Sequence, residues 1–373
     1  MYSNMTPKIS SHSLLILVIL KSRQVDGKYK FWLELNLKRG RERRPPENID
    51  SLQLPYDSNK FNFTKIKENE ILCVLTYVNQ VADEVFDSSG ISSKLHKEED
   101  DKNVNASTLL VNVSPLGYGH VLLVPERFKQ IPQRLSLRAV NESIHLILLT
   151  SPLLGFRIGF NSLCALASVN HQHVHGWYLP RRLCTESASV NNLHGGILFE
   201  TTDLPLNGFM LQLDTSGTLA LAHRVFTLVN HLQQNDVAHN VFMTRGAVVS
   251  SCSHSLIKVH ENEDVNKDML ELCASENGFT GPLNLDRSTI RVYIWPRKSK
   301  IGAKFTPTTV PLFAEACAEL GGHVPMYQED RFENLTENEI VLAMKQQKLP
   351  DDIFEKLRTN ICELYSNEFI ITE

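Results

Sequence analysis

Three histidines at alternating positions constrain this chain more than any other feature of its sequence. His171, His173 and His175 lie in the stretch Ser168–Leu179. Along a β-strand, alternate side chains point to the same face. The pattern therefore predicts a strand over 168–179 that carries the three imidazoles on one face, about 7 Å apart. Burying three polar rings without partners would be costly, so a purely structural role is disfavoured.

Two kinds of chemistry fit such a run of imidazoles. Neutral imidazole is a common zinc ligand, so a metal site is one alternative. Nucleophilic or acid–base catalysis is the other, because a large fraction of histidine is unprotonated at neutral pH. No Asp, Glu or Cys lies within several residues of the run to complete a ligand set, and His120 is the nearest earlier candidate. The flanking residues therefore favour catalysis, in which a histidine attacks phosphorus and a second acceptor breaks the resulting phosphoramidate.

Hydrophobic periodicity predicts a chain of mixed α+β class with prominent antiparallel hairpins. Turn residues over 114–119 separate two β-rich runs, 108–113 and 120–124, and indicate a hairpin. Thr336 with Glu339 forms a capping box. A polar stretch near 250–288 is interpreted as a loop insertion. Helices are expected over 134–150, 219–233 and 336–346, and strands over 108–113, 120–124, 156–163, 168–179, 241–244 and 290–295.

Composition limits the classes of partner and the compartment. A formal charge of −4 argues against a broad basic surface, so no nucleic-acid partner is expected. The longest aliphatic run, Leu14–Leu20, is too short to span a bilayer, and no membrane partner is expected. The seven scattered cysteines form no CxxC pair. They suit free thiols in a reducing compartment, so a cytoplasmic location is expected.

The histidine run, with the segment Gly119–Pro125 (GHVLLVP) ahead of it, resembles the histidine-triad superfamily, which includes galactose-1-phosphate uridylyltransferase. The resemblance is closer to the GDP-D-glucose phosphorylases and to the plant GDP-L-galactose phosphorylases, and it spans about Phe31–Leu349. Besides the histidine run, it is carried by RRPP at 43–46, KFNFTK at 60–65, NVSPL at 112–116, GFRIGFNSL at 155–163, AHNVFMTRG at 238–246 and ELGGHVP at 319–325.

The resemblance implies a histidine-triad-like fold of two related halves, with antiparallel sheets flanked by helices. We expect an atypical leader over 1–27, a catalytic domain over 28–205, and a C-terminal domain over 206–373 that contains the polar insertion. The second half lacks a copy of the histidine run, so by analogy it would be catalytically silent and serve the substrate pocket.

The resemblance also implies a reaction. His173 would attack the α-phosphorus of a GDP-hexose and release hexose 1-phosphate, after which inorganic phosphate would take the GMP unit. His171 and His175 would neutralise charge on the non-bridging oxygens. The implied partners are GDP-glucose and phosphate, with no cofactor and no metal, and the sequence does not fix the oligomeric state. His175 favours GDP-glucose, because the plant relatives have glutamine there. Another histidine-triad nucleotide hydrolase or nucleotide-sugar nucleotidyltransferase is the alternative.

Further substrate-binding residues are expected beside the histidines and in basic stretches. Asn161, Ser168 and Asn170 match positions that in the relatives hold phosphate or ribose. Turn and strand-end hydrogen bonding is the alternative role for these three, and solvated charge is the alternative for the basic residues. Trp177 and Tyr178 are expected in the core. The full set of expected substrate-binding residues is Asn161, Ser168, Asn170, Arg43, Arg44, Lys65, His120 and Lys298.

Overall fold

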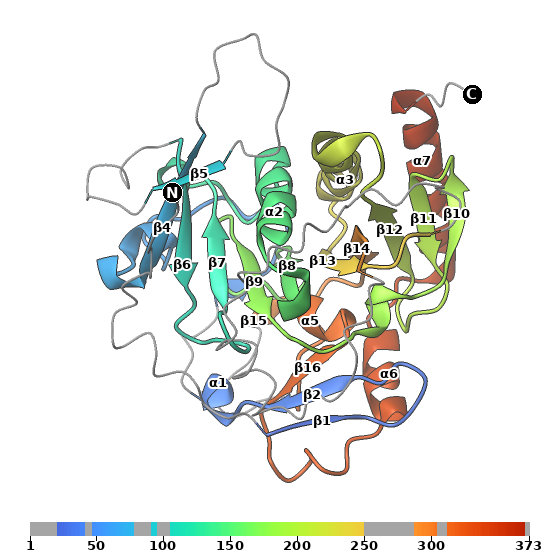
Figure 1. Ribbon diagram of the computed structural model, residues 1–373, viewed down its shortest axis with the longest axis horizontal. Helices are drawn as coiled ribbons and strands as arrows, with labels where there is room; N and C mark the ends of the chain where they lie inside the picture. Colours follow the sequence, from blue (N-terminus) through green and yellow to red (C-terminus); the bar gives the residue numbers. More distant parts are fainter. Residues whose placement is uncertain are drawn as a thin grey trace, which may run out of the picture.

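An eleven-stranded antiparallel sheet forms the centre of the protein, with strand order β10-β11-β12-β14-β13-β8-β9-β7-β6-β4-β5 (Figure 1). The computed structural model describes residues 21–41, 47–77, 91–94, 105–249, 287–303 and 312–369. The strands of the large sheet are β4 Ile71–Tyr77, β5 Ile91–Lys94, β6 Ser107–Val111, β7 Val121–Val124, β8 Phe156–Asn161, β9 Val174–Tyr178, β10 Val190–His194, β11 Leu198–Thr201, β12 Gly208–Gln212, β13 His239–Gly246 and β14 Thr289–Pro296.

Strands β8 and β13 join the two halves of this sheet. They pair antiparallel, with Asn161 opposite Asn240 and Ile158 opposite Met243. Every residue of β8, β13 and β14 is buried, so both faces of the sheet are covered at its centre. The protein is a mixed α+β chain in which helices flank a large antiparallel sheet. This architecture confirms the fold class predicted from the sequence. The division of the chain near residue 205 stays a prediction.

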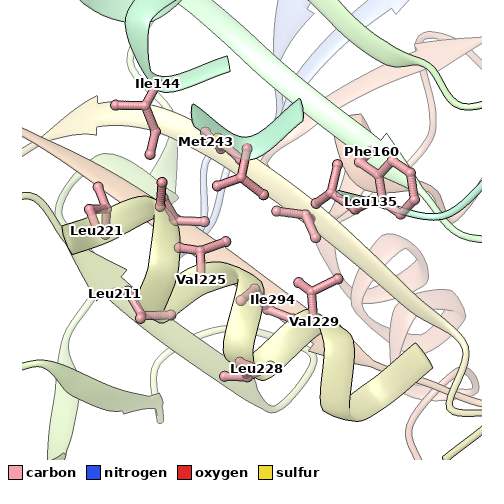
Figure 2. Close-up of a cluster of buried hydrophobic side chains, with 14 of the residues drawn as sticks. Leu135, Ile144, Phe160, Leu211, Leu221, Val225, Leu228, Val229, Met243 and Ile294 are labelled. Carbon is pink, nitrogen blue, oxygen red and sulfur yellow. The ribbon is translucent and has the colours of Figure 1, made fainter. Parts of the chain in front are cut away.

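Two long helices cover one face of the sheet (Figure 1). They are α2 Leu137–Leu149 and α3 Gly217–Gln234, and they lie side by side. Figure 2 shows the apolar stripe of α3, with Leu221, Val225 and Leu228 among its members, facing the sheet. These residues recur at the spacing that places side chains on one side of a helix. Near β10, α7 Asp351–Glu368 contributes Phe354, Leu357, Ile361 and Tyr365 to the same core.

A second core lies on the opposite face of the large sheet. It contains Trp177, Phe242 and Trp295 together with residues of a small three-stranded sheet, β1-β2-β16. In Figure 1 this small sheet lies on the side of the large sheet away from α2 and α3. The remaining strands and α-helices are β1 Ser22–Gln24, β2 Trp32–Leu35, α1 Leu37–Arg41, β3 Asn48–Ile49, β15 Gly302–Ala303, α5 Cys317–Leu320, β16 His323–Met326 and α6 Glu337–Lys345.

Most elements predicted from local pattern are present. The hairpin is β6–β7, and the three expected helices correspond to α2, α3 and α6. Helix α2 begins after Ser136, whose side chain accepts from the Ala139 N–H, and α6 begins with the predicted Thr336–Glu339 capping box. The expected strand over 168–179 is wrong in its first part, because β9 begins only at Val174.

Some expectations fall outside the described residues. These include Leu14–Leu20 and nearly all of the polar stretch near 250–288. Across the part of the chain that is described, no helix is both long enough and apolar enough to cross a membrane. Five cysteines lie in the described ranges and carry free thiols, namely Cys73, Cys164, Cys184, Cys317 and Cys362.

Candidate active site

The three alternating histidines gather at the beginning of β9, but not as successive positions of one strand. Only His175 belongs to β9, whereas His171 and His173 precede it. Pairing of β9 with β8 ends at His175 opposite Gly159, and pairing with β7 ends at Val174 opposite Leu123. The ring centroids of His173 and His175 are 5.1 Å apart, closer than the spacing expected along a regular strand.

The ring of His173 is held in one tautomer by the backbone carbonyl of His171. Its Nδ1 lies 2.8 Å from the carbonyl oxygen of His171, which can only accept a hydrogen bond. In the neutral ring, Nδ1 therefore carries the proton, and Nε2 carries the lone pair needed for nucleophilic attack. The residue is buried, and the ring of Phe63 lies 5.0 Å away between centroids.

His171 presents the opposite arrangement of its ring nitrogens. Its Nδ1 accepts a hydrogen bond of 3.1 Å from the backbone N–H of Phe63. Burial, and secondarily the nearby His173, lowers the pKa of His171 to about 3, so the ring is neutral and its proton lies on Nε2. That buried Nε2 makes no hydrogen bond of standard geometry among the described residues, although the Arg127 backbone lies near enough to raise the pKa of the ring. It is therefore a donor that a ligand oxygen could satisfy.

His120 fixes the tautomer of His175. The backbone N–H of Leu116 donates to His120 Nδ1 at 2.6 Å, so the proton of the neutral His120 ring is on Nε2. That Nε2 lies 3.1 Å from His175 Nδ1. Asn112 Nδ2 also lies 3.2 Å from His120 Nε2. Because both atoms are donors, they form no hydrogen bond, and the Leu116 contact decides which nitrogen of His120 carries the proton. Neutral His175 consequently carries its proton on Nε2.

Burial keeps His120 neutral. It lowers the pKa of His120 well below 6.5, and the positive charge of Arg39 acts in the same direction. Arg39 lies on α1, and its guanidinium donates to the Ser114 carbonyl in the loop that leads to His120. A second arginine, the buried Arg127, donates to the Phe63 carbonyl at 3.2 Å. Its backbone raises the pKa of His171 by hydrogen bonding, and its positive charge, a smaller effect, lowers that pKa. Two arginines therefore lie beside the histidine cluster.

The side chains of the two predicted asparagines form hydrogen bonds with other residues of the protein. Asn161 Oδ1 accepts from Asn240 Nδ2 at 2.7 Å and from the Cys317 N–H at 3.0 Å. Asn170 Oδ1 accepts from the Gln133 N–H at 2.9 Å, and its Nδ2 donates to the carbonyls of Leu54 and Pro55. The bonds of Asn170 hold the segment before His171 in place, and a substrate-binding role for either asparagine side chain stays a prediction.

The other predicted residues differ in position. Ser168 is half-buried, and its carbonyl accepts from the Glu47 N–H at 3.2 Å. Lys65 is exposed and donates to the carbonyls of Asn59 and Lys60. Lys298 is exposed, with its backbone N–H bonded to the Gln347 carbonyl. Arg43 and Arg44 lie outside the described residues.

The expected placement of Trp177 agrees with the structure. Its side chain is fully buried, and its Nε1 donates to His323 Nδ1 at 3.1 Å. His323 Nε2 in turn lies 2.7 Å from a carboxylate oxygen of Glu34.

Across the described ranges, no group of three or more His, Cys, Asp and Glu side chains is arranged to hold a metal ion. The zinc alternative therefore finds no ligand set in that part of the chain.

The sequence interpretation missed Gln133. This buried residue lies between the 3-10 turn Arg127–Lys129 and α2, and it bonds to the backbone of His173 at both its N–H and its carbonyl. A glutamine in a loop before a helix carries no pattern that would mark such a role. Only the approach of two segments that are distant in sequence reveals it.

Comparison with known proteins gives a consistent match over most of the chain. The GDPGP1-like N-terminal domain matches residues 16–177, and the GDPGP1-like C-terminal domain matches residues 184–368. GDP-D-glucose phosphorylase 1 of Homo sapiens is 35% identical over 356 residues, which cover 94% of this chain and 78% of that protein. GDP-L-galactose phosphorylase 2 of Arabidopsis thaliana is 30% identical over 60% of this chain and 51% of that protein. The crystal structure of yeast Ap4A phosphorylase Apa2 aligns over 89% of both chains with a TM-score of 0.48 and 13% identity.

Proposed function

The chain belongs to the GDPGP1-like family, and we propose that it is a GDP-D-glucose phosphorylase that transfers GMP from GDP-glucose to inorganic phosphate. The products are GDP and glucose 1-phosphate. The observation that carries the proposal is the 2.8 Å contact between His173 Nδ1 and the His171 carbonyl. It leaves the lone pair on His173 Nε2, which is the form of imidazole that attacks phosphorus.

The reaction proceeds in two displacements at the same phosphorus. His173 Nε2 attacks the α-phosphorus, and the bond from that phosphorus to the bridging oxygen breaks. Glucose 1-phosphate leaves with the bridging oxygen, and a phosphate group is a good enough leaving group to need little acid assistance. An oxygen of inorganic phosphate then attacks the guanylyl-histidine, the phosphorus–nitrogen bond breaks, and GDP leaves.

The flanking histidines act as donors in this proposal. The Nε2–H of His171 bonds to a non-bridging oxygen of the α-phosphoryl group, where negative charge builds up in the transition state. His175 donates from its Nε2 in the same way, in the tautomer that His120 selects. Both donors are fixed before substrate arrives, so little reorganisation is needed during the reaction.

The positive charge comes from arginine rather than from histidine in this proposal. The low pKa values of His171 and His120 keep both rings uncharged at neutral pH. GDP-glucose and phosphate together bring several negative charges, so a cation is needed nearby. Arg39 and Arg127 lie beside the cluster and supply it. The free thiols of the described cysteines suit a reducing compartment, and we place the reaction in the cytoplasm.

One assay tests the proposal directly. Purified protein is incubated with GDP-glucose, with and without phosphate, while GDP, GMP and glucose 1-phosphate are measured. GDP and glucose 1-phosphate that form only with phosphate support a phosphorylase. GMP in both conditions would instead indicate a hydrolase, and no turnover would overturn the choice of substrate. The matched control is His223→Ala, because His223 is exposed on α3, whereas His173→Ala removes the attacking group.

A further inference from the structure

Strands β8 and β9 separate beside the histidine cluster. Their pairing runs from Phe156 opposite Tyr178 to Gly159 opposite His175 and then stops. A continued ladder would bring Asn161 opposite His173. Both residues are buried at this point, so their backbone polar groups need partners.

The side chain of Gln133 occupies the gap between the two strands. Its Oε1 accepts from the His173 N–H at 2.8 Å. Its Nε2 donates to the His173 carbonyl at 3.1 Å and to the Asn161 carbonyl at 3.0 Å. The amide thus engages both backbone groups of His173, as a residue on a neighbouring strand would do, while it also bonds to β8.

The backbone around Gln133 supports the same segment. The Gln133 N–H donates to Asn170 Oδ1 at 2.9 Å, and the Ile131 carbonyl accepts from the Gln172 N–H at 2.8 Å. The peptide between His171 and Gln172 is therefore held at its N–H by the Ile131 carbonyl and at its own carbonyl by the His173 ring. That carbonyl fixes the ring of His173, so the position of the ring depends on the backbone that Gln133 holds.

We propose that Gln133 is a positioning residue for the attacking histidine: its amide replaces the missing strand partner of His173 and aims His173 Nε2 at phosphorus. The inference rests on the proposed role of His173. A shift of about 1 Å in a reacting group can cost about 10²-fold in rate. Loss of the amide should therefore slow the chemical step much more than it weakens substrate binding.

A second buried glutamine provides a matched control. Gln233 on α3 makes the same pair of bonds to the backbone of Leu135, with Oε1 accepting from the N–H at 2.7 Å and Nε2 donating to the carbonyl at 3.2 Å. It braces the same segment two residues further on, at Leu135. Gln133→Met removes three side-chain hydrogen bonds, two of them to the attacking residue, whereas Gln233→Met removes two, both to Leu135.

The experiment measures the release of glucose 1-phosphate in a single turnover, together with the Kd for GDP-glucose and the melting temperature. We expect Gln133→Met to lose about 10²-fold in single-turnover rate with little change in Kd. Gln233→Met should lose similar thermal stability and keep the rate. Gln133→Glu should recover part of the rate, and more at lower pH, because a protonated carboxyl can still accept from the His173 N–H and donate one bond.

Two results would overturn the inference: an undiminished rate in Gln133→Met, or an equal loss of rate in Gln233→Met. If Gln133→Met does not fold, the rate and pH profile of Gln133→Glu decide in its place. If the wild-type protein does not turn over GDP-glucose, the proposed function fails separately. The inference is then tested with diethylpyrocarbonate, by following the modification of His173 with peptide mass spectrometry. The rate of this modification should fall in Gln133→Met and not in Gln233→Met.

Discussion

His120 Nε2 and His175 Nδ1 lie 3.1 Å apart, with the Leu116 N–H on the far side of the His120 ring. This chain of contacts sets which nitrogen of His175 carries the proton. His120 directly precedes β7, and His175 lies on β9. The bond between them therefore also joins two neighbouring strands at the site. One histidine can in this way set the position of the proton on its neighbour.

We predict that His120→Phe slows GMP transfer and leaves the fold intact. Phenylalanine keeps the aromatic volume but removes the donor that selects the His175 tautomer. Loss of one such hydrogen bond of about 1.4 kcal/mol corresponds to about a tenfold lower kcat. Steady-state kinetics with GDP-glucose and phosphate check this, with circular dichroism as the control for folding. A kcat equal to that of the wild type would show that the tautomer of His175 does not matter.

His173→Ala and His175→Gln should separate nucleophile from donor. The alanine variant is expected to lose both turnover and covalent labelling by guanine nucleotide, because no other nitrogen can take the place of Nε2. Glutamine at 175 retains an N–H donor, so this variant should keep part of the activity. Radiolabel retained on denatured protein measures the intermediate. Full activity in His173→Ala would exclude a covalent mechanism through this residue.

Stability should fall as the pH drops below about 6.5, because the buried histidines, His120, His171 and His239 among them, resist protonation. Burial lowers the pKa of His171 to about 3 and that of His239 to about 4. Between these values and about 6.5, the unfolded chain binds protons that the folded protein does not. Each histidine then removes about 1.4 kcal/mol of unfolding free energy per pH unit as the pH falls, and has no effect above about 6.5.

Urea denaturation at several pH values measures this dependence. His239→Gln should show a shallower loss of unfolding free energy between pH about 6.5 and about 4, because one of these buried groups is gone. The exposed His223→Gln should reproduce the wild-type slope. An identical slope in all three proteins would mean that His239 is protonated equally in the folded and unfolded states.

Glu186 is expected to contribute more to stability than any surface carboxylate. It is buried and forms ion pairs with both Arg157 and Arg287. Its replacement by alanine leaves two guanidinium groups without their counter-ion and should cost about 3–5 kcal/mol. The exposed pair Arg358–Glu355 is the comparison, and Glu355→Ala should cost less than about 1 kcal/mol. Chemical denaturation of both variants would reveal equal losses if burial were unimportant.

Local pattern in the sequence was sufficient for much of the fold. Helix α3 follows from apolar residues at helical spacing, and the beginning of α6 follows from its Thr336–Glu339 capping box. The β6–β7 hairpin follows from two β-rich runs with turn residues between them. These features depend on contacts between residues close in the chain, so composition and spacing specify them. The histidine run and its flanking motifs also predict that His173 is the attacking residue.

Tertiary structure decided the geometry of the candidate site. Alternation predicted one long strand, yet β9 begins only at Val174, because pairing with β7 and β8 ends there and Gln133 takes the place of a strand partner. The donor to His171 comes from Phe63, more than a hundred residues earlier in the chain. A strand's extent and a ring's tautomer depend on hydrogen bonds to segments remote in sequence. Spacing along the chain cannot encode those bonds, and only the packed structure brings their partners together.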